Sequence, residues 1–221
     1  TLFRSGISTF RDAGGLWDKY PVEQVATPEG YARNPELVIN FYNERRKQLL
    51  EVRPNDGHLG LAELEADFNV TVVTQNIDNL HERAGSRRII HLHGELTKVC
   101  SSRDPYNPHY IKELKPDEYE VKFGDKAGDG TQLRPFIVWF GEPVPEIETA
   151  VNYVEIADIF VIIGTSMNVY PAAGLLNYVP REAEVYLIDP KPVDVHSMRR
   201  IHVIQKGASE GVRELRSLLQ P

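Results

Sequence analysis

The stretch VTVVTQNIDNLHERAGSRRIIHLHGEL, residues 70–96, contains two apolar runs, and polar side chains follow each of them. Residues 70–74 and 88–92 predict two strands, and residues 79–84 predict a short helix between them. Ligands of an open parallel sheet bind beyond the carboxyl ends of its strands. We therefore expect the polar residues of these two strand ends to meet at one edge of a sheet: Gln75, Asn76, Asp78 and His93.

The rest of the chain alternates between apolar runs that predict strands and segments that predict helices. Further strands are expected at 136–140, 159–163, 184–188 and 201–204. Helices are expected at 35–51 and 57–67, and near 146–157, 171–178 and 208–219. This alternation is typical of α/β proteins, and we expect a doubly wound, mostly parallel, Rossmann-like sheet. Residues 100–134 are rich in proline, tyrosine and glycine and predict a small inserted subdomain, whereas 12–34 is expected to be a loop.

The composition argues against several classes of protein. The 221 residues carry 25 Lys and Arg against 32 Asp and Glu, so we expect no direct binding to nucleic acid. A single cysteine, Cys100, excludes an internal disulfide and a zinc site built from several thiolates of one chain. The longest apolar stretch, 159–164, is far shorter than the roughly 20 residues of a membrane span. We expect a cytoplasmic protein that does not bind membranes.

His91 and His93 lie two residues apart on a predicted strand and would share one face of it. Such a pair would suit a metal-dependent hydrolase, although the other candidate ligands have no characteristic spacing around it: His58, His81, His109 and Cys100. In the alternative, one histidine packs in the core and the other caps a loop.

The run of amide and carboxylate side chains from Gln75 to Asp78 also has two interpretations. Asn and Asp would satisfy free amides at the start of the next helix. The same groups supply the donors and acceptors that ribose hydroxyls and a carboxamide require. Gly164, Thr165 and Ser166 follow a buried strand, and Asp189 ends the next one, where an acid often binds an adenosine ribose. Together these features favour a nucleotide site.

Tyr42 and Arg45 are three residues apart on the predicted helix 35–51 and share a face. A phenol beside a guanidinium would hold a carboxylate, the guanidinium through a charge-assisted contact. In the alternative this face is simply exposed, because Arg46 and Lys47 adjoin it.

Five motifs, in family order along nearly the whole chain, make the sequence resemble the sirtuin family of NAD-dependent protein lysine deacylases. They are GISTFR (6–11), TQNID (74–78), HLHGE (91–95), VWFGE (138–142), and GTS (164–166) together with VYPAA (169–173). Phe41, Tyr42, Arg45 and Arg46 resemble the desuccinylase-like branch of bacterial and mitochondrial sirtuins, which accepts acidic acyl groups.

The resemblance implies one sirtuin-type catalytic domain over residues 1–221. Its large Rossmann-like part would comprise approximately 1–34, 52–96 and 135–221. Its small subdomain would comprise approximately 35–51 and 97–134.

The resemblance also implies a reaction and the residues that serve it. The acyl oxygen of an acylated lysine in a protein attacks the anomeric carbon of NAD, nicotinamide leaves, and O-acyl-ADP-ribose forms. His93 would be the general base toward a ribose hydroxyl, and histidine suits this task because its ordinary pKa lies near working pH. Asn76 and Asp78 would position the ribose, water and the nicotinamide amide. The acyl group removed would be succinyl or malonyl in preference to acetyl.

Two sets of binding residues follow from the same motifs. The NAD-binding residues would be Gly6, Phe10, Arg11, Gln75, Asn76, Ile77, Asp78, Gly164, Thr165, Ser166, Asp189 and Ala208. The residues that bind the acylated peptide would be Tyr42, Arg45, Gly141, Glu142 and Tyr170.

Three features depart from the family pattern. Relatives usually carry two cysteine pairs that hold a structural zinc, whereas this chain has only Cys100, so we expect no zinc. Relatives begin with an apolar strand and a Gly-Ala-Gly loop, whereas this sequence joins the first motif midway. The adenosine-binding Asn-x-Glu of relatives reads Leu187-Ile-Asp189, which keeps the acid and loses the amide. Mono-ADP-ribosyl transfer and a non-catalytic NAD or ADP-ribose binding module are the alternative functions.

Overall fold

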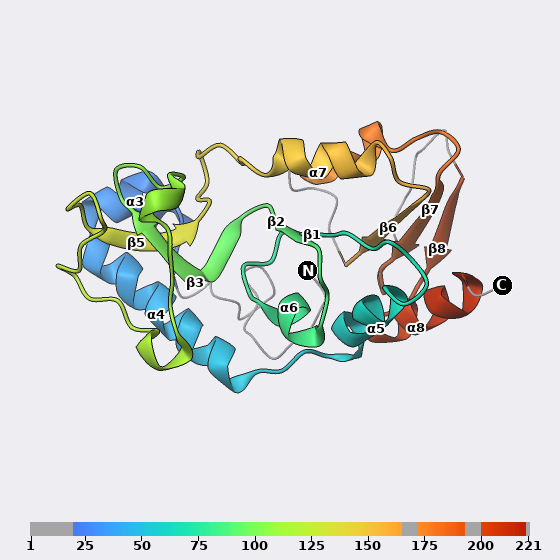
Figure 1. Ribbon diagram of the computed structural model, residues 1–221, viewed down its shortest axis with the longest axis horizontal. Helices are drawn as coiled ribbons and strands as arrows, with labels where there is room; N and C mark the ends of the chain where they lie inside the picture. The colour runs from blue at the N-terminus through green and yellow to red at the C-terminus, as the bar shows by residue number, and fades with distance from the viewer. Residues whose placement is uncertain (1–19, 165–171, 193–199, 220–221) are drawn as a thin grey trace.

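The computed structural model describes residues 20–164, 172–192 and 200–219. An antiparallel sheet and a long helix lie at one end of the described molecule, and parallel strands with their helices lie at the other (Figure 1). The expected α/β architecture is confirmed, and the strands among the described residues form three sheets.

The parallel strands end where the candidate site residues begin. β1 (Val72–Thr74) pairs in parallel with β2 (Ile89–His91), and α6 (Leu80–Ala84) connects them. β6 (Ile159–Ile163), β7 (Glu184–Ile188) and β8 (Ile201–Ile204) form a second parallel sheet in that order. These three strands lie at the predicted residues, because runs of apolar residues suit strands that are covered on both faces.

Among the described residues, four helical segments pack against the second parallel sheet. α5 (Asp56–Leu64) and α8 (Ala208–Leu219) pack against each other, and their leucines bury Tyr186 and Ile188 of β7. α7 (Ile147–Val154) and η3 (Ala172–Tyr178) contribute to a separate apolar cluster with β7 and β2. The helix predicted near 171–178 is η3, which is a 3-10 helix over its described residues.

A cavity of about 460 Å³ lies between β1 and β6 and is lined by both strands. Leucines of α5, α8 and η3 also line this cavity. Within the described part of the chain, β1 pairs only with β2 and β6 only with β7. The parallel strands are therefore in two groups rather than in one continuous ladder.

The antiparallel sheet corrects one prediction, and its longest strand was not predicted from the sequence. It consists of β4 (Lys112–Glu113), β3 (Gly94–Ser101) and β5 (Leu133–Ile137), in that order. We expected a strand of the parallel sheet at 136–140, but the strand ends at Ile137 and runs antiparallel to β3. β3 was not predicted, because Glu95, Thr97 and Lys98 interrupt its apolar residues. Two 3-10 turns also lie in the insert, η1 (Pro108–Tyr110) and η2 (Pro116–Glu118).

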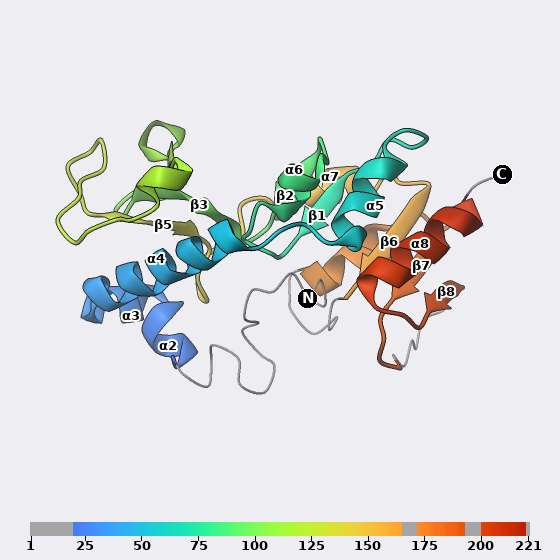
Figure 2. The same ribbon diagram turned by 90° about the horizontal axis from the view of Figure 1, so that it is seen from below.

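The segment expected to be a loop contains two short helices in its described part, α2 (Val22–Val25) and α3 (Pro28–Arg33). Thr27 caps α3, because its side chain accepts a hydrogen bond from the Gly30 amide at 3.0 Å. Both helices contact α4 (Pro35–Glu51), as the turned view shows (Figure 2). α4 begins where predicted, with the Asn34 side chain accepting from the Leu37 amide and Pro35 in the first turn.

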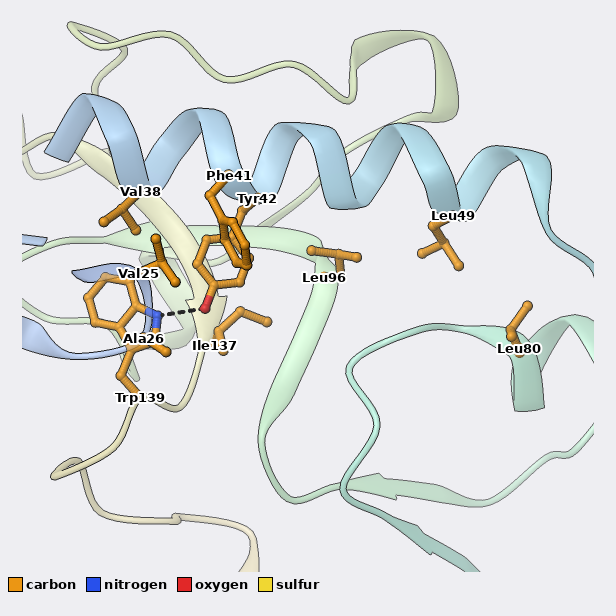
Figure 3. Close-up of a cluster of buried hydrophobic side chains, with 10 residues drawn as sticks. All are labelled: Val25, Ala26, Val38, Phe41, Tyr42, Leu49, Leu80, Leu96, Ile137 and Trp139. Atoms are coloured by element: carbon orange, nitrogen blue, oxygen red, sulfur yellow. Dashed lines mark hydrogen bonds between the residues drawn. The ribbon is translucent and has the colours of Figure 1, made fainter. Parts of the chain in front are cut away.

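A buried apolar cluster joins α4 to β3, β5 and the start of α6 (Figure 3). Its members are Val25, Ala26, Val38, Phe41, Tyr42, Leu49, Leu80, Leu96, Ile137 and Trp139. Leu80 lies two residues beyond Asp78, and Tyr42 is a predicted acyl-binding residue. The cluster therefore connects α4 to the loop that follows β1.

Hydrogen bonds connect the ends of the inserted segment. The Ser101 hydroxyl donates to Asp129 at 2.7 Å and accepts from the amides of Arg103 and Asp104 at 3.0 Å. Thr131 donates to the same carboxylate through its hydroxyl at 2.7 Å and its amide at 3.0 Å. Bonds from Ser101 and Thr131 bring the pKa of Asp129 down to about 2. These contacts hold one side of the insert together around an ionised carboxylate.

No helix in the described ranges is both long and apolar enough to cross a membrane.

Candidate active site

The loop after β1 presents polar groups at the edge where β1 and β2 end. The Asn76 amide donates to the Thr74 hydroxyl at 3.0 Å, and the Asp78 carboxylate accepts from the Leu80 amide at 3.1 Å. Asp78 thus satisfies an amide at the start of α6, as one of our two interpretations expected. The Gln75 side-chain nitrogen Nε2 is buried and has no hydrogen-bond partner within the described residues. A buried amide donor of this kind fits a ligand with acceptor oxygens, such as a ribose.

Burial shapes the electrostatics of this loop. Asp78 is buried, and its desolvation raises the pKa of its carboxyl above the ordinary value, against the opposing effect of the Leu80 amide. The same carboxyl interacts electrostatically with Arg45 of α4. The loop after β1 and α4 are therefore coupled electrostatically.

His91 ties β2 to the loop after β1. Its Nδ1 lies 3.0 Å from the carbonyl oxygen of Asn76, and its Nε2 lies 2.7 Å from a carboxylate oxygen of Glu82. Both neighbours are acceptors, so the ring satisfies both only as an imidazolium. Burial acts to lower the pKa of His91, but its bonds to Glu82 and Asn76 outweigh burial and raise the pKa above the ordinary value. Both nitrogens of His91 are therefore used in contacts that connect β2 to the loop after β1 and to α6.

The predicted pairing of His91 with His93 on one strand is wrong, because β2 ends at His91 and His93 lies in the following turn. Ligand atoms that would suit a metal come together instead at Glu82, His91 and Glu95, within 4.8 Å of one another. Lys98 forms an ion pair with Glu95 at 2.6 Å, so these charges already balance within the chain. The structure therefore does not support a metal-dependent hydrolase in which His91 and His93 bind the metal from one face of a strand.

His93 is half-buried at the junction between the parallel and antiparallel strands. Burial lowers the pKa of its imidazole, and a backbone hydrogen bond with Gln75 opposes that effect. Its own carbonyl accepts from the Val138 amide at 3.0 Å. The next residue, Gly94, has φ +81°, and a side chain there would clash with the carbonyl of Phe136. Because burial keeps the pKa of the His93 imidazole below its ordinary value, this ring is neutral near pH 7 and is able to accept a proton.

The other predicted nucleotide-binding residues of the described chain lie at the ends of β6, β7 and β8. The Gly164 amide donates to the Ile188 carbonyl at 2.9 Å, and the Asp189 amide donates to the Ile204 carbonyl at 3.3 Å. Asp189 is buried, and its carboxylate accepts from the Lys191 amide at 2.8 Å. Ala208 begins α8 and is buried. All three residues lie beyond carboxyl ends of parallel strands, where nucleotides bind in such sheets.

Tyr42 and Arg45 are buried on α4, so the alternative of an exposed helix face is wrong. Their exposed fractions are 1% and 5%. The Tyr42 hydroxyl accepts a hydrogen bond from Trp139 Nε1 at 3.1 Å, and Arg45 donates to the Gln48 side chain at 3.4 Å. Burial lowers the pKa of Arg45 to about 10 against the opposing influence of Tyr42 and Asp78, so the guanidinium remains charged at neutral pH.

The neighbouring Arg46 serves the insert. It donates through Nε to the Tyr119 carbonyl at 2.8 Å and through Nη2 to Asn43 at 3.1 Å. Asn43 in turn exchanges two hydrogen bonds with the backbone of Val121. The two adjacent buried arginines, Arg45 and Arg46, therefore have different hydrogen-bond partners.

Sequence reasoning missed two residues here, Arg134 within β5 and Trp139 just after it. Arg134 forms a two-bond ion pair with Glu142, at 2.7 and 3.0 Å, and its guanidinium lies 3.5 Å from the centroid of the Trp139 ring. The Glu142 carboxylate also accepts from the Trp139 amide at 2.8 Å. The Glu142 side chain is thus bonded within the chain, and the preceding Gly141 has φ +89°. The VWFGE motif (138–142) contains Trp139 and could have drawn attention to it, whereas no motif contains Arg134.

Six predicted site residues lie outside the described part of the chain: Gly6, Phe10, Arg11, Thr165, Ser166 and Tyr170.

Comparison with known proteins places this geometry in a family. Residues 3–171 match the model of the Sir2 family. An NAD-dependent protein deacylase of Bacteroides thetaiotaomicron is 85% identical over 217 residues, which cover 98% of this chain and 93% of the relative. A protein of the same name from Helicobacter pylori strain 26695 is 48% identical and covers 96% of this chain and 90% of the relative.

Solved structures agree with the sequence relatives. A Sir2 homologue in complex with NAD superposes with a TM-score of 0.79 at 36% identity and covers 98% of this chain and 86% of the homologue. A Sir2 mutant bound to a deacetylated p53 peptide and 3′-O-acetyl ADP-ribose has a TM-score of 0.77 at 26% identity and covers 97% of this chain and 88% of the other. On its sequence and on its fold, the chain belongs to the Sir2 family, the sirtuins.

Proposed function

We propose that the protein is an NAD-dependent protein lysine deacylase that prefers succinyl and malonyl groups to acetyl groups. The observation that supports the acyl preference most directly is the buried, charged Arg45 beside Tyr42, within electrostatic reach of Asp78. Arg45 offers a charged donor beside the Tyr42 hydroxyl on the same helix, and a guanidinium binds a carboxylate through a charge-assisted contact. The names of the sequence relatives and the ligands of the structural relatives support the deacylase activity itself.

The residues present fit NAD. The buried, unpartnered amide of Gln75 offers a donor, and the loop from Asn76 to Asp78 offers amide and carboxyl groups at the same edge. Bound NAD would supply an electrophilic anomeric carbon and, in nicotinamide, a leaving group. Asn76, Ile77 and Asp78 would hold the ribose and the nicotinamide amide, and Gly164, Asp189 and Ala208 would hold the adenosine end.

His93 would accept a proton from a ribose hydroxyl. A neutral imidazole is required for this step, and burial keeps the pKa of His93 below the ordinary value. This assignment is supported by the hydrogen bond from the Val138 amide to the His93 carbonyl, since Val138 is close in sequence to the proposed peptide-binding residues Gly141 and Glu142. The backbone of Gly141 and Glu142 would pair with the acylated peptide as an added strand.

We also propose that the insert contains no zinc, because its residues do not fit that metal. The only thiol, Cys100, is buried, and desolvation raises its pKa to about 12. The Ser101 and Asp129 hydrogen bonds hold this part of the insert instead. Metal analysis of the pure protein checks this point, and stoichiometric zinc would contradict it. We further propose the division into a large part (1–34, 52–96, 135–221) and a small one (35–51, 97–134), and a cytoplasmic location.

The deciding experiment measures nicotinamide release with acetyl-lysine and succinyl-lysine peptides of the same sequence. We expect release with both peptides and a higher kcat/KM with the succinyl peptide. Label transferred from NAD to a protein acceptor would instead indicate mono-ADP-ribosyl transfer. ADP-ribose binding in a calorimeter without nicotinamide release would indicate a binding module.

A further inference from the structure

The hydrogen bond between Trp139 and Tyr42 has a defined direction. An indole N–H is a donor only, so the Tyr42 oxygen is necessarily the acceptor of the 3.1 Å contact (Figure 3). A phenol that accepts one hydrogen bond keeps its own proton for a second partner. Both residues are almost completely buried, so this second partner is not bulk water.

The indole itself is held on several sides. The Arg134 guanidinium lies over its ring, and the Tyr31 ring packs against it with centroids 5.2 Å apart. Arg134 is fixed by Glu142 and by a 2.8 Å bond to the Ile137 carbonyl. The Trp139 amide donates to the same Glu142 carboxylate. The donor that faces Tyr42 therefore has a fixed position before any ligand arrives.

We propose that Trp139 is a positioning residue for acyl recognition, because its indole N–H orients the Tyr42 hydroxyl so that the phenol proton points to the carboxylate of a succinyl or malonyl group. This inference rests on the proposed acyl preference. Tyr42 keeps that proton at neutral pH, since burial raises the pKa of its hydroxyl to about 12 against the opposing bond from Trp139. Arg45 on the same helix supplies the positive charge, and Trp139 supplies the orientation of the second donor.

A double-mutant cycle tests the inference. Trp139→Phe keeps an aromatic ring for Arg134 to cover and removes the indole N–H donor. We expect it to raise KM for a succinyl-lysine peptide about 5- to 10-fold, the size of one lost hydrogen bond, and to change KM for an acetyl-lysine peptide less than about 2-fold. In a Tyr42→Phe background the same change should have no further effect on either peptide. Tyr31→Phe is the matched control, because it keeps the ring against Trp139, and it should leave both values unchanged.

Each result decides something. Equal losses on both peptides, or effects of the two substitutions that simply add, would show that Trp139 is only part of the core and would overturn the inference while the acyl preference stands. A wild-type protein with no preference for the succinyl peptide overturns the acyl preference and this inference with it.

A second measurement covers the case in which Trp139→Phe does not fold. The chain has two tryptophans, so Trp17→Phe leaves Trp139 as the only indole fluorophore. We expect saturating succinyl-lysine peptide to shift its emission more than acetyl-lysine peptide does, and Tyr42→Phe to abolish the difference. The same response to both peptides would contradict a role of Trp139 in recognising the acyl carboxylate.

Discussion

The imidazole rings of His58 and His81 pack against each other inside the molecule, with their centroids 4.7 Å apart. Burial is the main cause that lowers the pKa of His58 to about 3 and that of His81 to about 4. Both values lie below the unfolded value near 6.5, so the contribution of this pair to stability is complete above pH 6.5 and is lost as the pH falls below it.

Urea unfolding between pH 7.5 and pH 5 checks this expectation. The free energy of unfolding should fall by up to about 1.4 kcal/mol per pH unit for each of the two histidines below pH 6.5. His81→Gln should reduce that slope, and His109→Gln, at an exposed position, should leave it unchanged. A slope that is the same in wild type and His81→Gln would show that other groups cause the acid sensitivity.

His91 should behave in the opposite sense. Although burial opposes it, the pKa of His91 is raised by Glu82 and Asn76, so its contribution is complete below the unfolded value near 6.5 and is lost as the pH rises through the folded value. His91→Gln should therefore cost more stability at pH 6 than at pH 8.5. Denaturant midpoints of both proteins at the two pH values measure the difference, and a larger loss at pH 8.5 would exclude the imidazolium.

Arg45→Met should lower kcat/KM for desuccinylation about 30- to 700-fold and leave deacetylation nearly unchanged. A buried charge-assisted contact to a carboxylate is worth roughly 2–4 kcal/mol, and an acetyl group does not make it. Arg46→Met is the matched control, because Arg46 bonds to Tyr119 and Asn43 of the insert network. It should lower stability without changing the ratio of the two activities. If both variants shift that ratio equally, Arg45 is not the acyl anchor.

His93→Asn should lower nicotinamide release about 10²- to 10⁴-fold, the usual contribution of a general base, while ADP-ribose binding measured by calorimetry is retained. Because the pKa of His93 is lowered, chiefly by burial, the fall of the wild-type kcat/KM in acid should have its midpoint below pH 6.5. Turnover by His93→Asn close to that of the wild type would refute the assignment of the base.

Gly94→Ala should destabilise the protein and reduce turnover, because the new side chain would clash with the Phe136 carbonyl and displace the adjoining His93. Gly124→Ala is its matched control: Gly124 also has positive φ, at +108°, but nothing lies within 4 Å of a side chain built there. Thermal unfolding and peptide turnover of both variants separate backbone strain from the clash. Similar losses in the two variants would mean that strain alone is responsible.

The parts of the fold that were predictable are those in which local sequence and burial agree. The strands at 159–163, 184–188 and 201–204 match because short apolar runs suit a buried parallel sheet. β3 was missed because its partners lie tens of residues away and several of its side chains are polar. The two short helices before α4 were missed because they are stabilised by packing on α4 rather than by their own periodicity.

The candidate site shows the same division. The motifs identified Gln75, Asp78 and His93, which the fold brings to one edge, and spacing paired Tyr42 with Arg45. Spacing alone could not show whether this helix face is buried or exposed, because the charged residues Arg46 and Lys47 follow Arg45 directly and are typical of an exposed helix. Nothing local could indicate that Arg134 stacks on Trp139 or that Trp139 donates to Tyr42 of α4, because these contacts arise only when distant segments pack together.

The position of His93 between the two kinds of sheet has a mechanical consequence. Its ring is hydrogen-bonded to the loop after β1, and its carbonyl is bonded to Val138, one residue before Trp139. A rotation of the antiparallel sheet relative to the parallel strands would therefore move His93 and Trp139 together. In the proposed function, seating an acyl group and aligning the base would then be one conformational event.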